Sequence, residues 1–439
     1  MRKSLTVVLL GLLVFGAFSA VAQAQVLKIA GLDGGWGREH WEELVARFVA
    51  ANPGVKIEMT LAQNIAEVLR PQIIARNYPD LIYLSVGSAG NLPDTLIKER
   101  AVLDITDFLD MEVPGEGVAV RDKIVPGFTD TLITNPYGDG KTYLAPLFYS
   151  PCGLFYNANL FGEGKYTLPE TWDEFFELGK IAQADGIALF TYPTTGYFDA
   201  FFYALLTAVG GPALFNRAMN YDVEAWSSPE MVQVFEIVGE LAKYVHPNTV
   251  AQANVAGFTK NQQLILDNEA LFVPNGTWLP GEMEEAPRAK GFEWGFTALP
   301  KLSADADAYS YTFFEQMFIP QGAREVELAK RFMAYLYSDE AAEIIYKKAG
   351  AVQPILGASD LMTDEDPNRL FYSVYEDGAK AAMGAFAAAP PVAGLDLTSD
   401  TGVLFGTVNA VVNGEVSVEK WHRDVVEAVK RVKATIDAQ

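Results

Sequence analysis

The sequence has few of the residues that build metal centres and redox sites. It contains one cysteine, Cys152, which excludes an internal disulfide and any cysteine-based metal cluster. Its three histidines, His40, His246 and His422, lie too far apart along the chain for a zinc signature. We therefore expect neither a disulfide framework nor a bound metal.

Positive charge is also scarce. The 33 Lys and Arg residues are outnumbered by 56 Asp and Glu residues, which leaves a formal net charge of −23. A nucleic-acid-binding protein needs clustered Lys and Arg to neutralise phosphates. The acidity therefore argues strongly against a nucleic-acid partner and against an anionic membrane surface. High net charge of one sign mostly keeps a protein soluble and monomeric, and we expect a monomer.

Motifs for cofactors and catalysis are missing too. The segment GLDGGWG at residues 31–37 fails the G-x-G-x-x-G spacing because His40 stands at the third position, and it lacks a P-loop lysine. No G-x-S-x-G elbow is present. We expect no cofactor and no catalysis. One enzyme class stays open, a secreted glycoside-active protein, since 56 acidic residues can supply a pair of carboxylates by chance.

The first 24 residues are typical of a secretory signal peptide. Arg2 and Lys3 precede an uncharged run at residues 5–20, and residues 22–24 form an A-x-A cleavage site. An uncleaved membrane anchor is the alternative, but the run is shorter than the ~20 residues that span a bilayer. We find no other stretch that could span one. We therefore expect an exported protein, periplasmic or extracellular, that is cleaved near Ala24.

Strand and helix signals alternate in the segment that follows. Strands at 26–30, 55–59 and 81–84 alternate with helices that begin near residues 41 and 64. This order is typical of a parallel sheet with right-handed crossovers, in an α/β fold. The 439 residues, half of them hydrophobic, suffice for two domains or one large one. Helix signals dominate further on, among them a capping box of Thr171 and Glu174.

Aromatic residues stand in segments that read as loops. Gly, Pro, Ser or Thr residues flank each of them. The aromatic residues are Trp36, Tyr149, Tyr192, Tyr197 and Trp278. A loop backbone buries a ring poorly, so these side chains favour a contact surface. Sugars suit them, because sugar C–H faces pack on aromatic rings while their hydroxyls need polar partners. The alternative is a secreted interaction protein whose loops bind another protein.

Six segments carry a resemblance to a known family. They are FVAANPGVKI (48–57), PDLIYLSVGS (79–88), YLAPLFYSPCGLFYNANLF (143–161), TLPETWDEF (167–175), LDNEALFVPNGTWL (266–279) and AKRFMAYLYSDEAAEIIYKKAGAVQP (329–354). In this order they resemble the extracellular solute-binding proteins of bacterial ABC sugar importers, the maltose-binding-protein-like group. Within the group, LRPQIIARNYPD (69–80) and NGTWLPGEMEEAPRAKGFEW (275–294) are most similar to binding proteins for N-acetylglucosamine and chitobiose.

The resemblance implies a type II periplasmic-binding-protein fold. Each of two lobes would be a mainly parallel sheet flanked by helices, with the ligand cleft between them. We expect the N-terminal lobe at 25–142 and 301–337 and the C-terminal lobe at 143–300 and 338–439. Hinge crossings would lie near 142–148, 297–301 and 337–339. The protein would bind a sugar and pass it to the membrane subunits of an ABC permease, although another sugar or a polyol stays open.

The resemblance also implies a set of binding residues. Trp278 would stack on a sugar ring, and Tyr192 or Tyr197 would supply another face. Glu282 and Glu315 would accept hydrogen bonds, although a solvated helix start is the alternative for Glu282. The first lobe would contribute Trp36, Gly87 and Ser88. The full expected set is Trp36, Gly87, Ser88, Tyr149, Ser150, Tyr192, Tyr197, Asn275, Trp278, Glu282 and Glu315.

Overall fold

A computed structural model describes the chain from residue 25 to residue 438. It leaves out residues 35, 89, 130, 163–164, 194–196, 254–256, 364, 388 and 400 within that range, and the side chains of residues 258 and 376. The expected signal peptide, residues 1–24, lies outside the described residues.

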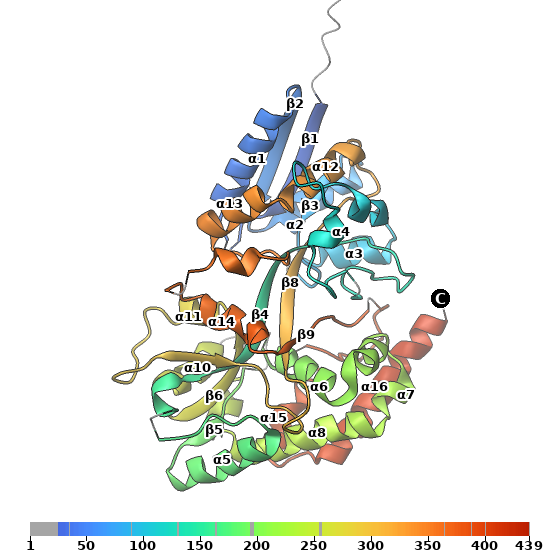
Figure 1. Cartoon of the computed structure of the whole chain (residues 1–439). Helices are drawn as coiled ribbons and strands as arrows, with labels where there is room; N and C mark the ends of the chain where they lie inside the picture. The colour runs from blue at the N-terminus through green and yellow to red at the C-terminus, as the bar shows by residue number, and fades with distance from the viewer. Residues whose placement is uncertain are drawn as a thin grey trace, which may run out of the picture.

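The N-terminal part folds into a lobe with a parallel sheet (Figure 1). β1 (Gln25–Leu32) lies between β2 (Val55–Ala62) and β3 (Leu81–Tyr83) and is parallel to both. The predicted alternation of strands and helices is confirmed. The helices are α1 (Glu39–Ala51), α2 (Ile65–Ile74) and α3 (Leu92–Lys98), followed by the short η1 (Thr106–Asp110) and α4 (Val120–Lys123).

Two long strands join this lobe to the rest of the molecule. β4 (Ala145–Asn157) and β8 (Tyr309–Phe318) run antiparallel through both halves of one nine-stranded sheet. The end of β8 pairs with β3, whereas the end of β4 pairs with β6 (Ala270–Gly276) and β7 (Trp294–Thr297). The chain therefore crosses between the lobes along β8, and not at residues 297–301 as expected. Thr297 pairs with Leu154, and Lys301 bridges to Thr171, so this stretch still belongs to the second lobe.

The second lobe packs helices on a small parallel pair, β5 (Ala188–Phe190) and β6. α5 (Trp172–Ala184) begins with the predicted capping box of Thr171 and Glu174. Trp226, Phe235 and Trp421 are among the fully buried side chains of its core. The other elements are η2 (Ala158–Leu160), α6 (Phe198–Met219), α7 (Val223–Trp226), α8 (Pro229–Leu241), η3 (Ala242–Tyr244), α9 (Thr249–Gln252), α10 (Phe258–Leu266) and α11 (Leu279–Glu282).

The C-terminal third returns to both lobes. α12 (Val326–Leu336) and α13 (Asp339–Ala349) pack on the first lobe, and α13 lies beside α1 (Figure 1). Ala341 and Ile345 are buried there in one core with Trp41 and Phe48. The lobe boundary expected at 337–338 is therefore placed too early, because this apolar face of α13 covers α1. The chain then forms η4 (Ala358–Leu361), α14 (Arg369–Glu376), β9 (Lys380–Ala382), α15 (Thr407–Val412) and α16 (Val418–Asp437).

One helix departs from the expectation that no stretch after residue 24 could span a membrane. By length and composition alone, α6 is long and apolar enough to cross a membrane. However, 61% of its apolar window is buried inside the protein, and the chain kinks at Gly211, where φ is 73°. Within the described part of the chain, α6 is therefore a core helix of the second lobe.

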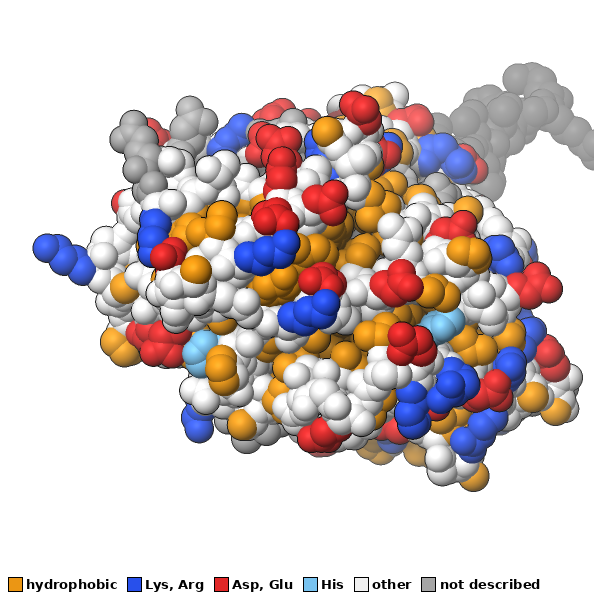
Figure 2. Space-filling model, turned by 90° about the horizontal axis from the view of Figure 1, so that it is seen from below, with side chains coloured by type: hydrophobic (Ala, Val, Ile, Leu, Met, Phe, Trp, Pro, Cys, Tyr) orange, Lys and Arg blue, Asp and Glu red, His pale blue; other side chains and the backbone are white. Residues whose placement is uncertain are grey.

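The surface of the second lobe mixes charges of both signs. Figure 2 views the molecule from below Figure 1 and shows Lys and Arg side chains scattered among Asp and Glu. Exposed ion pairs also form along α16, such as Lys420 with Asp424 and Lys430 with Glu427. Such pairs contribute little to stability. On this face, the described residues do not form the continuous basic surface that a polyanion requires.

Candidate functional site between the lobes

Loops from both lobes converge on the middle of β8. Trp36 follows β1 and contacts Glu315, whereas Trp278 follows β6 and contacts Phe313. Phe313 and Glu315 are two residues apart on one strand, so their side chains share a face of the sheet. The carboxyl ends of strands from the two lobes thus meet at one place. Crevices at such ends are where α/β proteins bind ligands.

The first-lobe wall is built around Glu315. The Trp36 indole nitrogen Nε1 donates to Glu315 Oε1 at 2.7 Å, and the Tyr83 hydroxyl donates to Glu315 Oε2. Burial raises the pKa of Glu315, and the two donated hydrogen bonds oppose that rise. The Trp36 ring also packs edge-on against Phe148, with 6.0 Å between ring centroids. Glu315 therefore holds Trp36 in position.

The turn after β3 is attached to the same strand. The backbone N–H of Val86 donates to Gln316 Oε1 at 2.9 Å. Gly87 follows with a φ of 78°, a backbone conformation that favours glycine, and its N–H donates to Asp94 Oδ2 at 3.0 Å. Ser88 Oγ is buried and has no hydrogen-bond partner among the described residues. The expected residues Gly87 and Ser88 thus lie in a turn held beside β8.

The second-lobe wall is built around Trp278. Its ring lies 6.1 Å from the Tyr197 ring, with 33° between the planes, and 6.2 Å from the Phe313 ring, nearly perpendicular to it. The Tyr197 hydroxyl donates to Glu282 Oε1 at 2.9 Å, and Gln262 Nε2 donates to Glu282 Oε2 at 2.7 Å. Glu282 is exposed, but both of its carboxylate oxygens accept hydrogen bonds. It is therefore part of this wall and not only a solvated helix start.

Two neighbouring residues of the expected set lie on opposite faces of strand β4. Ser150 pairs with Phe313 and so shares the face of the site, although it is only 3% exposed. Tyr149 pairs with Phe314 and projects from the opposite face. There its ring packs against Phe128 and Tyr372, with centroid separations of 5.4 and 5.1 Å. The expectation of a loop tyrosine in the site is wrong for Tyr149, because it belongs to a strand.

Two further expected residues are buried, so their side chains do not reach the surface. Tyr192 is 1% exposed, and its hydroxyl donates to Asn409 Oδ1 at 2.9 Å inside the second lobe. Asn275 is also 1% exposed, and its Oδ1 accepts the backbone N–H of Gly276 at 2.8 Å. Of the two tyrosines offered as a second sugar-stacking face, the structure brings Tyr197, not Tyr192, to Trp278.

Sequence reasoning missed three residues of the site: Phe313, Tyr83 and Gln262. Phe313 is 36% exposed, which is unusual for a phenylalanine in the middle of a central strand. One signal could have found it, since it stands two residues before the expected Glu315. Tyr83 and Gln262 carry no such signal, because each reaches the site through a contact that is distant in sequence.

The site offers aromatic faces flanked by carboxylate and amide groups. No group of three or more His, Cys, Asp or Glu side chains that could hold a metal ion occurs in the described part of the chain. Rings bordered by hydrogen-bond acceptors suit the reversible binding of a polar molecule with apolar faces. Two lobes that share two strands, each of which brings aromatic and polar side chains to β8, define a two-lobed binding protein.

Comparison with known proteins identifies the family. Residues 34–343 match the model of the bacterial extracellular solute-binding proteins, and the chain belongs to this family. Its relatives include the diacetylchitobiose-binding protein NgcE of Streptomyces coelicolor, 26% identical over 74% of this chain and 68% of that protein. Another is the multiple sugar-binding protein of Streptococcus mutans, 23% identical over 73% of each chain. Members of the family bind substrates and are not enzymes.

Solved structures share the fold over nearly the whole chain. The apo form of RafE from Streptococcus pneumoniae has a TM-score of 0.67 at 19% identity and covers 93% of this chain and 97% of its own. A chitin oligosaccharide binding protein has a TM-score of 0.65 at 18% identity and covers 94% of this chain and 100% of its own. The expected two-lobed type II fold is thereby confirmed. The expectation of a mainly parallel sheet in each lobe is wrong for the second lobe, because β4 pairs antiparallel with β6, β7 and β8.

Proposed function

We propose that this protein is the sugar receptor of an ABC importer. A sugar would bind between the lobes, with Trp36 and Glu315 on one side and Trp278 and Tyr197 on the other. The observation that carries the proposal is the convergence of loops from both lobes on Phe313 and Glu315. The protein would then deliver the sugar to the membrane subunits of its permease.

The substrate class proposed is N-acetylglucosamine or its β-linked disaccharide, chitobiose. The diacetylchitobiose-binding relative supports it, together with the resemblance at 69–80 and 275–294. Glu282 suits this class. Its carboxylate accepts a hydrogen bond from Tyr197, whose ring lies beside that of Trp278, and it can accept an amide or hydroxyl hydrogen bond of the sugar once the Gln262 amide shifts.

The proposal includes export and a monomeric state. The segment at 1–24 supports secretion with cleavage near Ala24, into the periplasm or the extracellular space. The net charge of −23 supports a monomer that has no nucleic-acid partner.

Isothermal titration calorimetry on residues 25–439 tests the function. The sugars would be N-acetylglucosamine, chitobiose, maltose, glucose and a pentose, each examined by NMR after the titration. One-to-one binding of one sugar, recovered intact, is the expected result. Cleavage of the sugar would contradict a receptor function. Binding of maltose or the pentose, but of neither amino sugar, would contradict the substrate class alone.

A further inference from the structure

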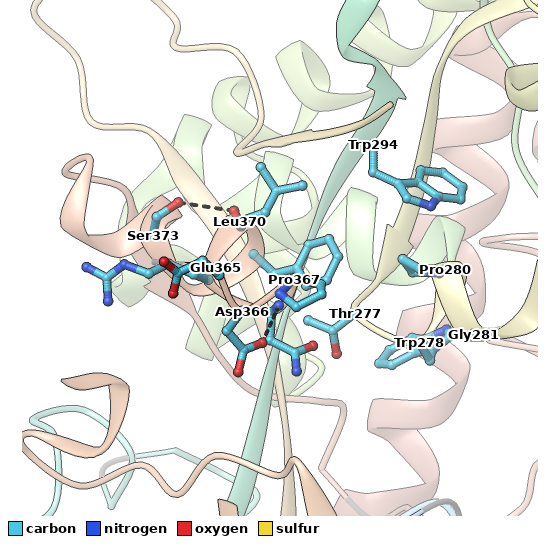
Figure 3. A pocket seen from close by; sticks show the side chains of 13 residues that line it. Thr277, Trp278, Pro280, Gly281, Trp294, Glu365, Asp366, Pro367, Leu370 and Ser373 are labelled. Carbon is cyan, nitrogen blue, oxygen red and sulfur yellow. Dashed lines mark hydrogen bonds between the residues drawn. The ribbon is translucent and has the colours of Figure 1, made fainter. Parts of the chain in front are cut away.

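A cavity of about 630 Å³ lies behind the strands that join the lobes. Phe128 and Tyr149 line it, and their rings pack against each other at 5.4 Å between centroids. Tyr149 projects from the face of β4 that lies away from Phe313, so the sheet separates this cavity from the site between the lobes. It is also distinct from the cavity that Figure 3 shows beside Trp278, which adjoins the site already described.

Both lobes line the rear cavity. Leu356 belongs to the first lobe, where its backbone N–H donates to the Lys123 carbonyl at 2.8 Å. Phe215 lies on α6 and Met383 follows β9, both in the second lobe. A Cβ atom added at Gly127 of the first lobe would lie 3.2 Å from Met383 Cε, so the two walls meet at one edge. A molecule in this cavity would therefore contact both lobes at once.

The chemistry of the lining selects a class of ligand. Most of the lining side chains are apolar, and the volume falls within the range of small-molecule sites. Lys380 is the charged residue among the described lining residues, and its ammonium is already paired with Asp307 at 2.5 Å. Asn216 of the second lobe and Ser359 of the first make no side-chain hydrogen bond within the described part of the chain. The lining thus suits an uncharged ligand with few polar groups.

We propose that the rear cavity is a second binding site, for an uncharged and largely apolar molecule that carries a hydroxyl or carbonyl group. Such a molecule contacts both lobes behind β4 and β8, whereas the sugar would contact both lobes in front of them. Bending about these strands that narrows the front widens the back, so the two ligands oppose each other. By linkage, each weakens binding of the other by the same factor. This coupling, but not the site itself, rests on the proposed function.

Titration with Nile red tests the site. This dye is uncharged and mostly apolar, it carries a carbonyl group, and its fluorescence rises when it leaves water. We expect a saturable one-to-one rise with the protein of residues 25–439 in the absence of any sugar. A fluorescence rise that does not saturate, or no rise at all, would overturn the inference.

Two variants place a charge at the rear cavity, one from each lobe. Leu356→Asp changes a side chain that is 56% exposed, and Asn216→Asp replaces an amide by a carboxylate of the same shape. Each should weaken dye binding about tenfold, because an apolar ligand would then lie against a charge. Ile181→Asp is the matched control and should change nothing, since Ile181 is 55% exposed and lies outside this cavity. An effect of only one cavity variant, or an equal loss in the control, would overturn the inference.

Dye and sugar together test the coupling. A saturating sugar should weaken dye binding severalfold, and saturating dye should weaken sugar binding by the same factor. Trp278→Ala should leave the dye affinity without sugar within about twofold, which excludes simple displacement from the site between the lobes. Loss of dye binding in Trp278→Ala would place the dye in that site and overturn the inference. Binding of no sugar would overturn the proposed function alone, because the dye titration decides the rear site independently.

Discussion

Trp278 is the residue on which sugar binding should depend most. Its ring packs against Phe313 of β8, one of the two strands that join the lobes. Trp278→Ala should weaken sugar binding by about 1–3 kcal/mol, the contribution of one well-stacked ring. Titration calorimetry of the variant against the wild type measures this loss. An unchanged dissociation constant would place the sugar elsewhere.

The two tyrosines near Trp278 should behave differently on loss of their hydroxyls. Tyr197→Phe removes the hydrogen bond to Glu282 and should weaken sugar binding severalfold. Tyr192→Phe removes a buried hydrogen bond to Asn409 and should lower the free energy of unfolding by about 1 kcal/mol with binding unchanged. Calorimetry and urea denaturation of both variants separate the two roles. Weakened binding in Tyr192→Phe alone would reverse the assignment.

His40 should make the stability of the protein sensitive to mild acid. It is 1% exposed behind Trp36, and burial lowers its pKa to about 4, against an ordinary value of about 6.5. Between these values the unfolded chain binds a proton that the folded protein does not, so the free energy of unfolding falls as the pH drops from about 6.5 to 4. Protonation of His40 lowers the free energy of unfolding by about 3 kcal/mol in full.

Urea denaturation at pH 7 and pH 5 measures this dependence. His40→Gln places a neutral side chain at the same position and should show a smaller fall in unfolding free energy than the wild type. An identical fall in the two proteins would mean that other groups carry the acid sensitivity.

At the scale of elements, the end of β6 positions the stacking ring. A Cβ atom added at Gly276 would clash with the Trp278 ring, so the ring lies directly against the glycine backbone. Gly276→Ala should therefore displace Trp278 and weaken sugar binding about tenfold or more. Calorimetry measures the loss, and the near-ultraviolet circular dichroism of Trp278 should change with it. Gly281→Ala is a matched control, because an added Cβ there meets no neighbouring atom.

Sequence patterns predicted single elements well. The capping box of Thr171 and Glu174 does start a helix, and the strand signals at 26–30 and 55–59 do pair in parallel. These features depend on neighbours in the sequence and on a period of 2 or 3.6 residues. Ser150-Pro151 resembles a turn and so predicts a loop around Tyr149, whereas pairing with β8 holds this segment in a strand.

At the scale of the whole molecule, the sugar should change the angle between the lobes. We expect that Trp36 and Trp278 touch one ligand in a closed form, and a ligand favours the state that it binds more tightly. We expect a saturable decrease in the radius of gyration by small-angle X-ray scattering when the binding sugar is added. Trp278→Ala should need more sugar for the same decrease. A radius unaffected by a saturating sugar would contradict closure.

The sequence by itself determined the class of the molecule. Its alternation of strands and helices indicated an α/β fold, and six segments in order indicated the family, since both are properties of local pattern. It also singled out Trp36, Trp278, Tyr197 and Glu315. Trp36 and Trp278 follow strands, Tyr197 precedes α6, and Glu315 lies on β8.

Only the tertiary structure decided which of the expected binding residues lie close together. The register of β4 against β8, with an irregularity between Pro146 and Phe148, sets the face on which each side chain lies, and a shift by one residue would exchange Tyr149 and Ser150. The contact of Trp36 with Glu315 joins residues 279 positions apart. Burial and register arise from such distant pairings, and they select Tyr197 over Tyr192 and add Phe313 to the site.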